Sequence, residues 1–171
     1  EVVITAIRHW GIENALNRFN GMWAFAYLDL TEKTVYLARD RFGVKPLYYF
    51  HDSIGLFFAS EIKTILEISK KRFSLDYQII GEYLDQSLAE SSNNTFFQGV
   101  YKIPAGSYAE INLTNEQRQI KFQKYYQLDE HLEYTYIEFN DLVQRIRELF
   151  FDAVKIRLRS DVPIGVLLSG G

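Results

Sequence analysis

The sequence predicts an α+β protein, and three features of the chain indicate this fold class. Short aromatic and apolar segments separated by tight turns fill residues 22–59, a pattern typical of antiparallel strands. Apolar residues recur at helical spacing from Phe139 to Ala153, which predicts an amphipathic helix. An apolar run from Ile164 to Leu168 then leads into a Ser-Gly-Gly end, which predicts a strand buried on both faces, as in a parallel sheet, that opens into a turn. The chain therefore combines an antiparallel part with the start of an α/β part.

Composition narrows the classes of protein that the chain can represent. With 171 residues, 47% of them hydrophobic and 16% aromatic, it has ample material for a core. The net charge of −3, with Lys and Arg scattered, gives no reason to expect nucleic acid as a partner. No apolar run approaches the ~20 residues of a membrane span and no signal peptide is recognisable, so we expect no membrane partner and a cytoplasmic location. Zero cysteines exclude disulfides, thiolate metal sites and a thiol nucleophile within these residues.

The N-terminal part is expected to begin with helices and to continue as strands. Residues 1–10 and 12–19 each place apolar side chains on one helical stripe. Residues 22–30 are apolar on both faces and predict a buried central strand. Because tight turns join the segments that follow, we expect one antiparallel sheet with further strands at 34–38, 46–50 and 55–59.

Further helices and strands are expected before the chain changes character. Ser60 is the expected N-cap of a helix that runs to Ser69, and a second helix is expected over 75–88, with Asp76 near its start. Short strands are expected at 96–101, 107–113 and 120–126. The acidic stretch 129–136 lacks helical or strand periodicity and predicts a linker. The expected division is therefore into residues 1–128, the linker 129–136, and residues 137–171.

The segment 39–46, between two expected strands, contains the residues that look most like a site. Arg39 and Asp40 resemble a catalytic pair, but a buried ion pair that fixes the turn is the favoured interpretation. Met22 and Val44 are apolar residues, which favours a place in the core for both.

Several blocks of the sequence resemble glutamine-dependent asparagine synthetases, in that family's own order. Residues 21–26 resemble the G-M-F-A-F-A strand of its glutaminase domain, and residues 38–49 are similar to its A-R-D-R-x-G-x-K-P-L-Y-Y block. Residues 59–63 resemble its A-S-E-I-K helix start, and residues 102–106 its later P-a-G turn. Residues 161–171, of the form D-V-P-x-G-V-L-L-S-G-G, resemble the opening of its pyrophosphate loop. The resemblance covers nearly the entire chain.

This resemblance implies a two-domain amidotransferase. Residues 1–128 would be the C-terminal portion of an Ntn-type glutaminase, in which antiparallel sheets pack between helices. Residues 137–171 would be the first helix and strand of an ATP-pyrophosphatase-type synthetase domain. The implied substrates are glutamine, aspartate and ATP, with Mg²⁺ as the metal, and a homodimer is left open. Ammonia from glutamine would displace AMP from an aspartyl-adenylate and give asparagine.

The family's functional residues carry over only in part. Met22 and Val44 fall where the family lines the inner end of its ammonia passage. The start of the nucleotide-binding loop is matched by Leu168, Ser169, Gly170 and Gly171. The family's N-terminal Cys nucleophile, its glutamine-binding residues and its metal ligands match nothing in this sequence, whose first residue, Glu1, suggests a fragment or a processed chain. No catalytic residue is therefore assigned, and the chain by itself is expected to be inactive.

Three alternatives stay open. An asparagine synthetase-like amidotransferase could act on another acceptor, in a polysaccharide or antibiotic pathway. A non-catalytic homologue could keep the fold without the nucleophile. Another kind of ATP pyrophosphatase, such as an argininosuccinate or guanylate synthetase, is disfavoured by the hairpin and the Arg-Asp block of the N-terminal part.

Overall fold

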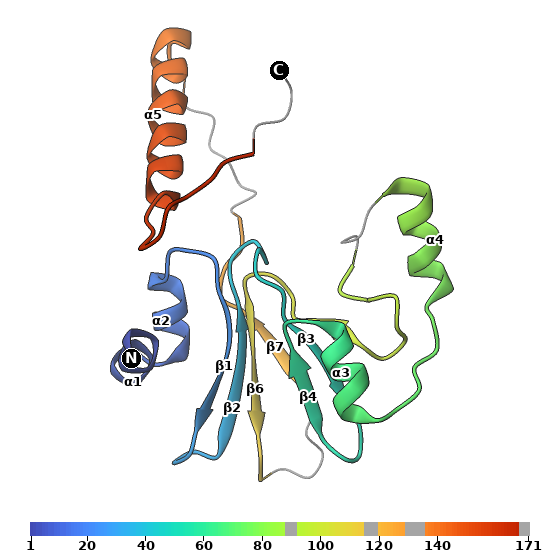
Figure 1. Ribbon diagram of the computed structural model, residues 1–171. Coiled ribbons are helices and arrows are strands. Elements are labelled where there is room, and N and C mark those ends of the chain that lie inside the picture. The colour runs from blue at the N-terminus through green and yellow to red at the C-terminus, as the bar shows by residue number, and fades with distance from the viewer. Residues whose placement is uncertain (88–91, 115–119, 129–135, 168–171) are drawn as a thin grey trace. The chain divides into compact units, whose positions relative to one another are not determined.

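The computed structural model describes residues 1–87, 92–114, 120–128 and 136–167, and the chain forms two compact units, Glu1–Leu128 and Asp129–Gly171 (Figure 1). The helices of the first unit are α1 (Val2–Trp10), α2 (Ile12–Arg18), α3 (Ile62–Ser69) and α4 (Tyr77–Gln86). Its strands are β1 (Ala24–Asp29), β2 (Thr34–Arg39), β3 (Tyr48–His51), β4 (Leu56–Ala59), β5 (Tyr101–Lys102), β6 (Ser107–Asn112) and β7 (Lys121–Lys124). The second unit contains α5 (Phe139–Arg157).

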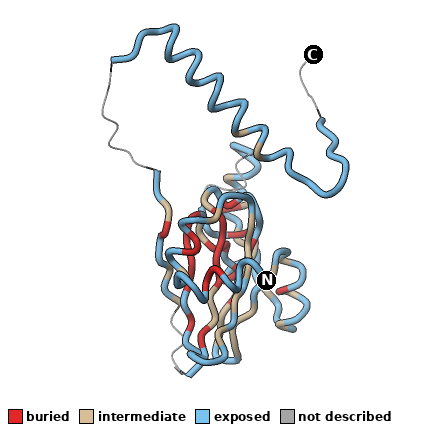
Figure 2. The backbone as a smooth tube through the Cα atoms, turned by 90° about the vertical axis from the view of Figure 1, so that its left-hand side faces the viewer, coloured by how far each residue is buried: buried red, intermediate tan, exposed pale blue. Residues whose placement is uncertain are grey.

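The first unit is built in layers, with two antiparallel sheets between helices. One sheet has the strand order β1-β2-β6-β7 and the other the order β4-β3-β5. Helices α1 and α2 cover the outer face of the four-stranded sheet, and α3 packs on the outer face of the three-stranded sheet (Figure 1). Buried residues concentrate along the sheets (Figure 2).

Apolar side chains from both sheets meet in the central layer of this unit. Leu37 of β2 and Ile111 of β6 point from the four-stranded sheet towards Leu47 and the ring of Tyr49. The outer layers have their own clusters, in which Leu16 of α2 packs beside β2 and β6, and Ile65 of α3 packs beside β3. Each sheet therefore buries apolar side chains on both of its faces.

The prediction of one sheet over residues 22–59 is wrong, because these strands divide between two sheets. On the side away from β1, β2 pairs with β6, with Leu37 opposite Ala109. Strand β3 pairs with β4 and β5 instead. Segment 40–47 therefore does not close a hairpin but carries the chain from one sheet to the other. The partner that completes each sheet comes from far along the chain, which the spacing of the strands does not reveal.

The prediction of a buried central strand at 22–30 is also wrong. Strand β1 begins at Ala24 and lies at the edge of its sheet, with β2 as its one partner among the described strands. Its side chains are half-buried or exposed, and Leu28 is among the exposed ones. The apolar character of this strand on both faces thus does not make it central.

The predicted helices are present, with one incorrect cap. Asp76 caps α4, since its carboxylate accepts a hydrogen bond from the Ile79 N–H at 3.3 Å. Helix α3 begins at Ile62 with Glu61 as its N-cap residue and without a side-chain cap, so the prediction of Ser60 as the cap is wrong. Of the strand expected over 96–101, only Tyr101 is assigned, together with Lys102, to β5.

In the second unit, α5 matches the predicted amphipathic helix, and Lys155 and Arg157 lie in its last turn, where the helix dipole favours cations. None of its residues is buried within the described part of the chain (Figure 2). Residues 164–167, predicted to begin a buried strand, form no strand and are exposed. A strand needs a neighbour to bond with, and the described part of this unit offers none. Residues 168–171 lie outside the described residues.

None of the helices in the described parts of the chain is both long and apolar enough to cross a membrane.

Candidate functional site

Asp40 is the centre of the connection between the two sheets, and it is only 2% exposed. Its carboxylate accepts hydrogen bonds from four backbone N–H groups. Oδ1 accepts from Phe42 at 3.2 Å and from Val44 at 3.0 Å. Oδ2 accepts from Trp23 at 3.2 Å and from Lys45 at 2.9 Å. A buried carboxylate requires such partners, and bonds to an ionised acceptor are stronger than bonds between neutral groups.

Arg39 holds the same turn through backbone carbonyls. Its Nε donates to Lys45 O at 2.8 Å, Nη1 donates to Ile103 O at 2.9 Å, and Nη2 donates to Gly43 O at 2.5 Å. Gly43 has a φ of +65°, and a Cβ placed on it would lie 2.9 Å from Arg39 Cζ. The turn therefore requires glycine at this position, both for its backbone conformation and for the approach of the guanidinium group.

The predicted ion pair between Arg39 and Asp40 is wrong, although both residues are buried and both fix the turn as expected. The described residues include no ion pair between their side chains. Successive side chains at the end of a strand point to opposite faces, so the two charges separate. Each charge is balanced instead by backbone dipoles, the carboxylate by N–H groups and the guanidinium group by carbonyls.

Tyr125 completes this arrangement, and no sequence pattern marks it for this role. Its hydroxyl donates to the Arg39 carbonyl at 2.9 Å, and its ring stacks on Trp23 with centroids 6.0 Å apart. Burial, together with the nearby Asp40 carboxylate, raises the pKa of the Tyr125 hydroxyl. The hydroxyl therefore remains a protonated donor at neutral pH.

A hollow of about 460 Å³, here called the Met22 hollow, opens beside this turn. It is lined by Met22, Trp23, Ala24, Lys45, Pro46 and Ser60. Met22 is 49% exposed and Val44 is 53% exposed, so the prediction that both pack in the core is wrong. Met22 lies in the lining, and Val44 precedes the lining residue Lys45 in the turn. Asp40 accepts hydrogen bonds from the backbone N–H groups of two residues that line this hollow, Trp23 and Lys45.

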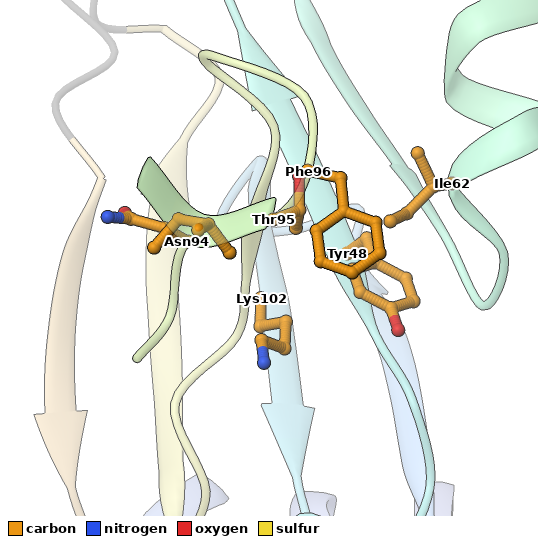
Figure 3. A pocket seen from close by; sticks show the side chains of 7 residues that line it. Tyr48, Ile62, Asn94, Thr95, Phe96 and Lys102 are labelled. Carbon is orange, nitrogen blue, oxygen red and sulfur yellow. The ribbon is translucent and has the colours of Figure 1, made fainter. Parts of the chain in front are cut away.

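A second hollow, of about 160 Å³, is lined by residues of the three-stranded sheet, of α3 and α4, and of the segment that leads into β5 (Figure 3). Its lining consists of Tyr48, Ile62, Ile79, Asn94, Thr95, Phe96 and Lys102. Thr95 is held in this wall by the bond that its hydroxyl donates to the Val100 carbonyl at 2.8 Å. Lys102 of β5 is 7% exposed, so this wall contains a buried amine that sequence analysis did not single out.

The nucleotide-loop residues expected from the sequence, Leu168, Ser169, Gly170 and Gly171, lie outside the described residues. Within the part of the chain that the structure describes, no three His, Asp or Glu side chains gather as a metal site would require.

Comparison with known proteins identifies the family. Residues 1–126 match the model of the glutamine amidotransferase domain, and residues 145–171 match the model of asparagine synthase. The whole chain aligns with asparagine synthetase (glutamine-hydrolyzing) 2 of Bacillus subtilis at 36% identity and with asparagine synthetase (glutamine-hydrolyzing) 1 of the same organism at 33% identity. It also aligns over its whole length with amidase chyE of Penicillium rubens at 33% identity.

The chain spans about a quarter of the length of these relatives: 24%, 26% and 24% in the order given. The two family models match consecutive parts of this one chain, with the amidotransferase model over most of it. The chain therefore belongs to the glutamine amidotransferase domain family, with a C-terminal segment that matches the asparagine synthase family.

Proposed function

We propose that these residues work in a glutamine-hydrolysing asparagine synthetase. The observation that carries the proposal is the order of the two family matches, an amidotransferase domain followed by asparagine synthase in one chain. A module that releases ammonia, joined to one that activates an acceptor, is the arrangement that glutamine-dependent amidation needs. The layered sheets of the first unit are consistent with an Ntn-type glutaminase domain over residues 1–128. Residues 129–136 are the proposed linker, and residues 137–171 the proposed start of the synthetase domain.

The proposed reaction balances as follows. Water and glutamine give glutamate and ammonia. The side-chain carboxylate of aspartate attacks the α-phosphorus of ATP, which forms an acyl-adenylate and releases pyrophosphate. Ammonia then attacks the acyl carbon, AMP leaves, and a proton is released with the amide product. A free carboxylate is a poor electrophile, so the adenylate supplies the leaving group that amide formation requires.

The residues proposed for this chemistry are few. Leu168, Ser169, Gly170 and Gly171 would begin the nucleotide-binding loop, because they match the start of that loop in the family and glycines allow backbone N–H groups to point towards phosphate. Met22 and Val44 would line the inner end of the ammonia passage, a role to which their exposed apolar side chains are suited. Mg²⁺ is proposed for the ATP step, with no ligand assigned among these residues. A cytoplasmic location and a homodimer belong to the same proposal.

The experiment uses the complete gene product that contains these residues. We expect formation of asparagine, AMP and pyrophosphate from glutamine, aspartate, ATP and Mg²⁺, with the amide nitrogen of labelled glutamine recovered in the asparagine. Release of pyrophosphate without any dependence on aspartate would contradict aspartate as the acceptor. An N-terminal residue other than Cys in the mature protein would contradict glutamine hydrolysis.

A second candidate is an amidotransferase with another acceptor. It is favoured by the relative named amidase chyE, which matches this chain as well as one of the asparagine synthetases does. Aspartate-independent, ATP-dependent amidation of a different carboxylate would support it. A non-catalytic homologue would form neither glutamate nor AMP.

A further inference from the structure

We propose that Asp40 is a positioning residue for ammonia transfer, because its carboxylate holds the two backbone segments that carry Met22 and Val44 at a fixed separation. The inference rests on the proposed function, since it takes these two side chains as part of the ammonia passage. Asp40 itself would touch neither ammonia nor substrate. Its effect would pass through the backbone that it binds.

One oxygen of the carboxylate connects the two segments directly. Oδ2 accepts from Trp23 N–H at 3.2 Å on one side and from Lys45 N–H at 2.9 Å on the other. Trp23 follows Met22, and both line the Met22 hollow, as does Lys45. The second oxygen accepts from Val44 N–H at 3.0 Å, so the residue proposed for the passage is bound to the same carboxylate.

The backbone carbonyl groups of the turn are also bound, by Arg39. Lys45 donates its N–H to Asp40 while its carbonyl accepts from Arg39 Nε at 2.8 Å. Both backbone polar groups of this lining residue are therefore fixed, one by each of two buried charged side chains. The backbone just before β1 is bound as well, because Asp40 N–H donates to the Trp23 carbonyl at 2.9 Å. A wall fixed in this way resists small displacements that a single surface hydrogen bond would permit.

Small displacements matter for ammonia. A neutral ammonia molecule that meets bulk water is protonated and no longer attacks an acyl carbon, so a passage must stay apolar and narrow. Misplacement of about 1 Å by a mutation remote from the chemistry can lower a rate by about 10²-fold. If Asp40 sets the spacing of Met22 and Val44, its loss should let ammonia escape without removing the chemistry at either active site.

Asp40→Asn is the sharpest substitution, because it keeps the shape of the side chain. Whichever oxygen is replaced, an NH₂ group would face two backbone N–H donors that then lack an acceptor. Arg39→Lys is the second variant, since it keeps the charge but cannot reproduce the three directed bonds to carbonyls. Asp29→Asn is the matched control: Asp29 also accepts two backbone bonds, from Thr31 and Glu32, but in the β1–β2 turn.

The experiment measures, in the complete gene product, glutamate formed per AMP released with glutamine as the nitrogen source. AMP release is also measured with ammonium chloride in place of glutamine. Misfolded molecules form neither glutamate nor AMP, so the ratio of the two products reports on the folded protein alone. For Asp40→Asn and Arg39→Lys we expect the ratio to rise about threefold or more, with ammonia-dependent AMP release unchanged. Asp29→Asn should leave both quantities unchanged.

The outcomes separate the inference from the proposed function. An unchanged ratio in Asp40→Asn, or in Arg39→Lys should the first variant be insoluble, would overturn the inference, because the Arg39–Asp40 turn would then contribute to stability alone. Equal loss of glutamine-dependent and ammonia-dependent activity would also overturn the inference. If the wild-type protein forms no AMP from either nitrogen source, the proposed function itself fails, and the inference falls with it.

Discussion

Replacement of Gly43 by Ala tests whether the Arg39–Asp40 turn is as tightly packed as the structure indicates. Gly43 has a φ of +65°, and an added Cβ would lie 2.9 Å from Arg39 Cζ, 3.1 Å from Arg39 Nη2 and 3.1 Å from Ala105 Cβ. The guanidinium group cannot simply move aside, because it is held by three backbone carbonyls. The substitution therefore imposes both backbone strain and the loss of at least one buried hydrogen bond.

The magnitude follows from these two contributions. A left-handed conformation costs about 1–2 kcal/mol for a residue with a Cβ. Loss of a hydrogen bond to a charged group adds about 1.5–3 kcal/mol. The free energy of unfolding of Gly43→Ala should therefore fall by about 2.5–5 kcal/mol.

Gly99→Ala is the matched control, measured in the same urea titrations followed by circular dichroism. Gly99 has a φ of +84°, but its added Cβ would meet only the Phe50 ring, at 3.9 Å, which is ordinary contact. We expect a loss of about 1–2 kcal/mol from backbone strain alone. Equal losses in the two variants would refute the view that Arg39 packs against Gly43 and that this contact stabilises the turn.

The other predictions concern the core, the pH dependence and activity. Ile65→Ala should lower the free energy of unfolding by about 2–5 kcal/mol, because Ile65 is fully buried. Ile68→Ala, on the same helix at 49% exposure, should lower it by well under half as much. Similar losses for the two variants in urea titrations would contradict the packing of α3. Burial and the Asp40 carboxylate raise the pKa of Tyr125 above 10.0, so the unfolded chain loses this proton first and stability should fall as pH rises above about 10. Tyr125→Phe should make that fall shallower in titrations between about pH 9 and 11, and an unchanged slope would count against the buried hydroxyl. The 171-residue chain by itself should release no ammonia from glutamine, and ammonia above the blank in a coupled assay would overturn this expectation.

Much of the local structure could be predicted from the order of residue types. The amphipathic stripe predicted α5, Asp76 marked the start of α4, and the aromatic runs predicted β1 to β4. These features depend on residues within one or two turns of one another, so a local pattern contains the information. The family could likewise be inferred from short blocks, and the comparisons confirm it.

The candidate site was predicted only in outline. The prediction that Arg39 and Asp40 are buried and fix a turn is confirmed. The prediction that they do so as an ion pair is wrong, because each binds backbone groups instead. Their partners are backbone N–H and C=O groups, which every residue carries, so no residue type in the sequence marks them. Exposure of Met22 and Val44 was missed for a related reason, since apolar character predicts burial only on average.

The sequence by itself determined most of the helices and strands, though not the strands expected at 96–101 and 164–168, and the family that the chain resembles. Only the tertiary structure decided that β2 pairs with β6 and that β3 pairs with β5. The chain therefore passes from one sheet to the other in the segment that begins after Arg39, where Arg39 and Asp40 bind the backbone. Strand pairing joins segments far apart in the chain, and its free energy depends on how both faces of each sheet are covered at once. This free energy depends on the whole folded unit, so no local stretch of sequence determines it.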